Sequence, residues 1–196
     1  MEMRFAQMSR VPRVLVHPAL KRAAYRLRQV RQQLGFVAPL SAEDQAEVTR
    51  AISTSVINHV PTKAISLFQT MSPADQQHSL RVYRGLQSRG CTNKDLLAAA
   101  LLHDVGKGQG RVPFWTRPLI VIGKRCAPQL LARLVVYPHV NMPRWRRSLS
   151  YAWYHADVGA ELAAAAGLSE RAVLYIRTHH QPHGPAAELH AVDEDS

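Results

Sequence analysis

The stretch AALLHDVGKGQG, residues 99–110, determines how we interpret the chain. It begins with Ala and Leu, which favour a helix, and continues directly into His103 and Asp104. Because a helix turns by about 100° per residue, these two side chains do not share the apolar face of that helix. We expect a packed helix that delivers an imidazole and a carboxylate to one point beyond its last turn. Lys107 follows, between two glycines.

Helix signals dominate the rest of the chain and predict an all-α fold. Ser41, Ser72, Thr92 and Ser169 each stand where a side chain can cap the first turn of a helix. The predicted helices span about 42–58, 73–89, 93–105, 145–166 (as one helix or two), 170–180 and 186–194, with a short segment after residue 61. Five prolines divide residues 111–144 into short pieces.

The length of 196 residues and the hydrophobic content of 46% predict one folded domain. We assign residues 41–196 to this helical domain and residues 1–40 to a basic N-terminal extension that is helical or partly disordered. The two cysteines have no metal-ligand spacing, which favours a reducing compartment. No apolar run reaches the roughly 20 residues of a membrane span, and we expect a cytoplasmic protein.

Positive charge is concentrated in two segments. Residues 1–34 contain eight Lys or Arg and one acid, and residues 111–154 contain eight Lys or Arg and no acid, whereas from residue 155 the acids predominate. Such segments attract anionic partners, including nucleic acid, phosphorylated small molecules and acidic membrane surfaces. The alternative is a solvated, arginine-rich face without a partner.

Several histidines lie on predicted helices beside small or aliphatic residues. His78 lies in QQHSLRVY, His155 in WYHADVGAEL, and His179 and His180 in YIRTHHQP. Together with the His103–Asp104 pair they provide imidazole and carboxylate groups, which suit Mn, Fe, Co, Ni or Zn. A buried aspartate is costly unless a cation or strong donors compensate its charge, and a metal provides that compensation.

This series of motifs resembles the HD superfamily of metal-dependent phosphohydrolases, over residues 72–193 of the chain. The resemblance rests on HDVGK, on the spacing of 25 residues from His78 to His103, and on the HxxxGAEL phrase at His155. It implies a single HD-domain helical bundle. It also implies one or two divalent ions, of Mn, Fe, Co, Ni or Zn, with Mg as an alternative.

The resemblance implies a ligand for the metals at each motif. The expected ligands are His78, His103, Asp104, His155, His179, His180 and Asp193. Within this set Asp104 joins the two ions, and His155 and His179 hold the second ion. His180 is either a further ligand or a residue that contacts a ligand without contacting the ion. For the last ligand, Asp195 and no ligand at all are the alternatives to Asp193.

The resemblance also assigns Lys107 to the substrate phosphate and, with Asp104, to catalysis. The alternative for Lys107 is to complement the negative end of the helix dipole. We interpret Gly106 and Gly108 as positions where the backbone approaches a ligand, and Gly159 as a small residue that lets helices pack closely. Arg81 lies one turn after His78 and is a second candidate for phosphate, or a solvated arginine.

The implied activity is hydrolysis of a phosphoester or phosphoanhydride of a small nucleotide, by a water that the metal activates. Specificity is expected in residues 111–154, where arginines alternate with aromatic side chains that could stack a base: Phe114, Trp115, Tyr137, Trp145, Tyr151, Trp153 and Tyr154. The alternative function is a non-catalytic metal-containing module whose basic flanks bind nucleic acid or another anionic partner. Residues 10–34 could attach the chain to a membrane surface. The sequence leaves the oligomeric state open.

Overall fold

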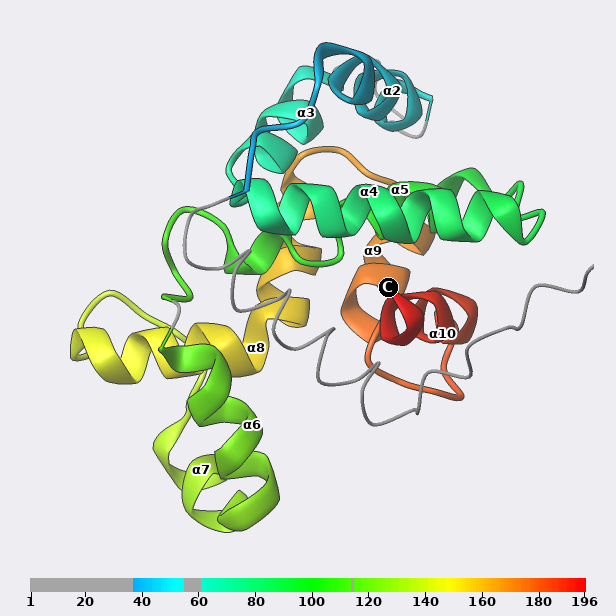
Figure 1. The fold of residues 1–196 in the computed structure, drawn as a ribbon. Helices are drawn as coiled ribbons and strands as arrows, with labels where there is room; N and C mark the ends of the chain where they lie inside the picture. Colours follow the sequence, from blue (N-terminus) through cyan, green and yellow to red (C-terminus); the bar gives the residue numbers. More distant parts are fainter. Residues whose placement is uncertain (1–36, 55–60, 114) are drawn as a thin grey trace, which may run out of the picture. The chain divides into compact units, whose positions relative to one another are not determined.

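The computed structural model describes residues 37–54, 61–113 and 115–196, and Figure 1 shows the chain. Every regular element in these ranges is a helix, which confirms the all-α fold. The N-terminal extension lies outside the described residues up to position 36, as does the membrane segment expected at 10–34. Within the described ranges, no helix has both the length and the apolar character needed to cross a bilayer.

Helix α5 (Lys94–Leu102) lies at the centre of the main apolar core. It contacts α4 (Pro73–Ser88), α9 (Glu170–Thr178), α2 (Ala42–Ser53) and α3 (Pro61–Gln69). Its side chains Leu96, Ala98, Ala99, Ala100, Leu101 and Leu102 are all buried. A helix that is apolar on all sides must be covered on all sides, and this coverage brings several helices to its C-terminal end.

The long helix α8 (Arg144–Ala165) contacts α9 and the short 3-10 helix η1 (Val105–Lys107) that follows α5. It is kinked at Tyr154, whose φ of −98° and ψ of 15° depart from helical values. Of the two alternatives for this segment, one helix or two, the structure shows two helical halves that meet at this kink. His155 follows the kink directly.

Two shorter helices, α6 (Thr116–Cys126) and α7 (Pro128–Leu134), pack on each other, and α6 contacts α8. They form a second apolar cluster with the first half of α8, composed of Val112, Ile120, Leu131, Val135, Leu149 and Ala152. The last helix, α10 (Ala187–Asp195), packs against α4, which carries His78. Figure 1 shows α10 beside α9 and the α6–α7 pair on the other side of α8.

Three of the predicted caps are confirmed, because Ser41, Ser72 and Ser169 accept backbone N–H groups at the starts of α2, α4 and α9. The fourth was wrong by one residue. Asn93, not Thr92, caps α5, and its side chain accepts from the N–H groups of Asp95 and Leu96. A carboxamide oxygen satisfies two donors at once in this position.

Helix α2 spans Ala42–Ser53 in the described part of the chain, and its predicted continuation to about residue 58 falls on residues outside that part. One other helix end differs from the prediction. Helix α5 ends at Leu102 rather than near Val105, so His103 and Asp104 lie in the turn that joins it to η1.

Candidate metal centre

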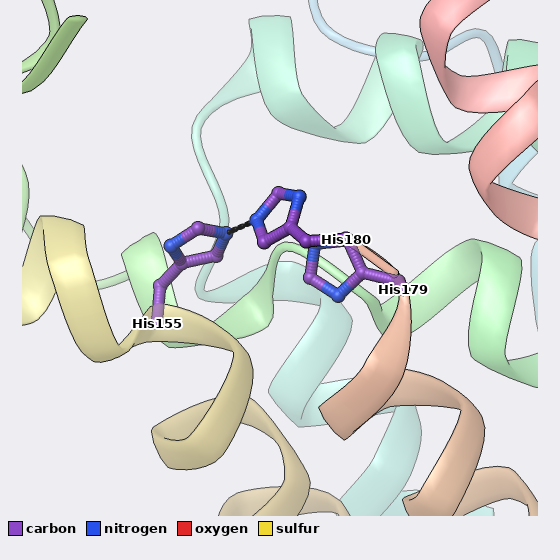
Figure 2. Close-up of side chains that lie close together, drawn as sticks. All are labelled: His155, His179 and His180. Atoms are coloured by element: carbon purple, nitrogen blue, oxygen red, sulfur yellow. Dashed lines mark hydrogen bonds between the residues drawn. The ribbon is translucent and has the colours of Figure 1, made fainter. Parts of the chain in front are cut away.

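Two groups of ligand atoms lie in the interior of the bundle. The first set is His78, His103 and Asp193, from α4, the end of α5 and α10; the second set is His155, His179 and His180, from α8 and the end of α9. Within each set, one ligand atom from each residue lies within 4.8 Å of the others. Figure 2 shows the second set, with the rings of His155 and His180 pointing toward each other.

The carboxylate of Asp104 lies between the two sets. Its Oδ1 atom is 3.8 Å from Nε2 of His103 in the first set and 3.6 Å from Nε2 of His155 in the second. The side chain is only 6% exposed. One buried carboxylate is therefore within reach of both groups of imidazoles.

Three of the histidines are oriented in the same way. Nδ1 of His103 donates to the carbonyl of Ala100, three residues earlier, at 2.9 Å. Nδ1 of His155 and of His179 make the same bond, to the carbonyls of Ala152 at 2.9 Å and Ile176 at 2.6 Å. A carbonyl only accepts, so Nδ1 carries the proton in each ring and Nε2 is the atom turned toward the cluster.

Two of these Nε2 atoms lack a partner. Nε2 of His103 and Nε2 of His179 are buried and make no hydrogen bond within the part of the chain that the structure describes. A buried polar atom left unsatisfied costs about 1–3 kcal/mol. A metal ion in each set would use the lone pair of one of these atoms, and the backbone bond to the opposite ring nitrogen is the usual support for a ligating histidine. The residues present therefore fit a divalent transition metal.

Electrostatics in the first set favour a proton on His103. Burial alone would lower its pKa, but the carboxylates of Asp104 and Asp193 outweigh burial and raise the pKa to about 9. Burial opposes ionisation of Asp193 as well, yet its contact with His103 and its hydrogen bond to His78 hold its pKa below the usual range. The shared proton leaves this set close to neutral when no cation is present.

The second set is neutral. Burial, helped by the positive charges of neighbouring groups, lowers the pKa of His179 to about 3 and that of His180 to about 4. Burial also lowers the pKa of His155. Because Nδ1 of the neutral His155 ring holds its proton, its Nε2 accepts from Nε2 of His180 at 2.9 Å. Neutral imidazoles are the form that binds metals.

His180 differs from the other two members of its set, since His155 and His179 are buried and His180 is exposed. The structure brings it into ligand distance, and both of its predicted roles, ligand and support, remain predictions.

The side chain of Lys107 forms an ion pair with Asp104. Its ammonium lies 2.6 Å from Oδ1 of Asp104, the same oxygen that lies near both sets of imidazoles. Lys107 and the histidine His103 lower the pKa of Asp104 well below its usual range, against the opposing effect of burial. The lysine is therefore the counter-ion of the central carboxylate in this state, and its contact with phosphate stays a prediction. The contact of Arg81 with the substrate phosphate also stays a prediction, and this side chain is half-buried on α4.

The structure gives Gly106 and Gly108 a packing role, and the approach of their backbone to a ligand stays a prediction. A Cβ at Gly106 would lie 2.1 Å from the carbonyl oxygen of His155, and one at Gly108 would lie 2.8 Å from Oγ1 of Thr70. Both glycines face protein, and Gly106 lets η1 lie directly against α8. The prediction for Gly159 is confirmed, because a Cβ there would lie 3.3 Å from the backbone nitrogen of Gly106.

A cavity of about 600 Å³ opens beside the turn that follows Lys107. Its wall includes Gln109, Arg111, Trp115, Arg144, Trp145, Arg147 and Tyr151. Three of the predicted aromatic side chains line it, whereas Trp153 and Tyr154 pack on the second apolar cluster. Tyr137 contacts Tyr154 edge to face. Phe114 lies outside the described residues. The pocket thus combines arginines with aromatic surface, and none of the described residues in its wall is acidic.

Comparisons of the chain with family models, with curated proteins and with solved structures find no match.

Proposed function

We propose that this chain is a metal-dependent phosphohydrolase of the kind its motifs resemble, the HD superfamily, and that it cleaves a phosphoester or phosphoanhydride of a small nucleotide. The observation that carries the proposal is the position of Asp104, a buried carboxylate between two sets of imidazole ligands. A single structural ion would require only one set.

Each set would hold one divalent ion, with Asp104 shared between them. His78, His103 and Asp193 would provide the first site, and the second set would provide the other. Bound ions of this kind act as Lewis acids and lower the pKa of a bound water toward neutrality. The three backbone carbonyls that fix the Nδ1 protons keep the Nε2 atoms aimed at these positions without further rearrangement.

Lys107 supplies positive charge at the edge of the centre. Its side chain is 20% exposed, so the ammonium can reach solvent-side groups as well as Asp104. If cations replaced it as the partner of Asp104, the ammonium of Lys107 would be able to contact the oxygens of a phosphoryl group. Fixed positive charge close to those oxygens stabilises the charge that develops during transfer.

The cavity beyond Lys107 supports a nucleotide as substrate. Arg111, Arg144 and Arg147 offer positive charge for phosphates, while Trp115 and Trp145 offer flat surface for a base. The guanidinium of Arg111 lies 5.7 Å from the ring centre of Tyr151. The aromatic wall favours a nucleotide over a simple phosphate ester.

The test is an activity screen of the purified chain with Mn, Co, Ni or Mg, using generic phosphoesters and a nucleotide panel. Turnover is expected with at least one metal, and Asp104→Ala should abolish both turnover and bound metal. His139→Ala is the matched control, because His139 is exposed and belongs to neither set. Turnover retained in Asp104→Ala contradicts the proposal, and bound metal without turnover of any substrate would instead indicate the non-catalytic module.

A further inference from the structure

In the described part of the chain, the exposed large apolar side chains gather in one segment. Of the ten large apolar side chains that are exposed in the described ranges, nine lie between residues 115 and 145: Trp115, Leu119, Val121, Ile122, Leu130, Val136, Tyr137, Val140 and Trp145. The tenth, Leu174, lies on α9. Single exposed apolar residues need no explanation, but a concentration of this kind marks an interaction surface.

The outer side of α6 carries the most prominent part of this surface. Leu119, Val121 and Ile122 are 48%, 62% and 56% exposed, whereas Ile120 between them is 7% exposed and packs into the second apolar cluster. The helix therefore already buries one apolar face against α7 and α8 and leaves a second one uncovered. Arg125, one turn after Val121, lies on that outer side and is exposed.

The same segment is uniformly positive. Residues 111–154 contain eight Lys or Arg and no Asp or Glu. On the α6–α7 pair, which we call the hairpin (residues 116–134), Lys124, Arg125 and Arg133 are exposed. An outward apolar face surrounded by cations without any acid is complementary to a surface that is both anionic and able to accept apolar groups.

We propose that the hairpin docks on the surface of an anionic lipid bilayer, with Leu119, Val121 and Ile122 entering the boundary between headgroups and acyl chains. The basic side chains would contact the headgroups, the arrangement found when amphipathic helices lie in a membrane interface. This attachment is independent of the metal centre, to which the hairpin contributes no ligand.

Three other partners fit this surface less well: the N-terminal segment of the same chain, a second copy of the chain, and nucleic acid. Residues 1–34 of the same chain contain eight basic residues and one acid, so they would be repelled by the hairpin, and a second copy would oppose one positive surface to another. Nucleic acid would satisfy the cations but would leave the apolar side chains of α6 in contact with phosphates or water. A bilayer satisfies both requirements.

The experiment is co-sedimentation of the full chain with vesicles of phosphatidylcholine alone and of phosphatidylcholine mixed with phosphatidylserine. The double variant Val121→Glu/Ile122→Glu should lower affinity for the anionic vesicles by about tenfold or more, because it removes two inserted apolar groups and adds two negative charges. Leu174→Glu, which changes an exposed leucine outside the segment, should bind like the wild type. Circular dichroism verifies that each variant is folded.

Three results would overturn the proposal. The first is no preference of the wild-type chain for anionic vesicles. The second is wild-type vesicle affinity in the hairpin variant, with binding lost instead in Arg26→Gln/Arg28→Gln, which would place the attachment in the N-terminal segment. The third is loss of self-association or of duplex DNA binding, rather than of vesicle binding, in the hairpin variant.

Discussion

Nε2 of His78 lies 2.8 Å from Oδ1 of Asp193, although 115 residues separate them in the chain. The contact joins α4 to the last helix and completes the first set of ligands. Asp193 also lies 3.6 Å from Nε2 of His103. The last helix therefore contributes directly to the proposed metal centre.

Asp193→Asn should remove one of two bound ions, because an amide neither carries the charge nor matches the ligand strength of the carboxylate. Asp195→Asn is the matched control on the same helix, where the carboxylate is 73% exposed and pairs with Arg89 at 2.8 Å. Metal analysis of both purified variants measures the effect. If Asp195→Asn loses the ion and Asp193→Asn retains it, the ligands of the first set are wrongly assigned.

Lys107→Met should bind metal more tightly and turn over more slowly. Without the ammonium, Asp104 has no competing cation, and the metal-free state carries a poorly compensated buried carboxylate, so affinity should rise by about tenfold or more. Turnover should fall by roughly a hundredfold if the ammonium stabilises the transferring group. Lys63→Met controls for loss of an exposed lysine elsewhere, on α3. Unchanged metal affinity would show that Lys107 and the cation do not share Asp104.

The two sites should respond differently to pH. The pKa of His103 is raised to about 9, so between about pH 6 and pH 9 the first site must lose a proton to bind metal, and its affinity should rise with pH. The pKa values of His179 and His180, at about 3 and about 4, lie below this window, so the second site should change little.

Titrations with a competing chelator at several pH values would measure this difference. The proton on His103 stabilises the metal-free fold below its ordinary pKa of 6.5, and that contribution disappears as the pH rises through about 9. Equal pH dependence for both ions would contradict the assignment of the proton to the first set.

Gly106→Ala should destabilise the fold and weaken the second metal site. The new methyl group would overlap the carbonyl oxygen of His155, so the backbone of His155 must shift and its ring must shift with it. The free energy of unfolding should fall by about 1–3 kcal/mol. Gly90→Asn is the control. A Cβ at Gly90 would have no atom of the surrounding structure within 4 Å, and Asn tolerates the φ of +83° at this position. Thermal unfolding and metal analysis report the two effects, and a wild-type melting temperature in Gly106→Ala would contradict the close packing of η1 on α8.

Local signals in the sequence predicted most of the helices. A serine before a helix and a glycine after it act through the backbone of a few residues, which explains why Ser41, Ser72 and Ser169 were assigned correctly. Asn93 and Thr92 are adjacent, and both can cap, so only the structure distinguishes them.

The motif order predicted the residues of both sets, which the structure brings together from distant parts of the chain. It did not predict the pairing of Lys107 with Asp104, because a lysine near a helix end satisfies several roles equally well. Nor did it reveal that Gly106 faces His155, since that contact depends on how η1 meets α8. The uncovered face of α6 was also missed, because alternating apolar residues in a proline-divided segment do not indicate which ones are covered.

The most direct measurement is the anomalous diffraction of crystals of this protein grown with manganese. The account predicts two peaks, one among His78, His103 and Asp193 and one among His155, His179 and His180, with Asp104 contacting both. Absence of any peak at these side chains, in crystals where manganese binds elsewhere or not at all, would contradict it.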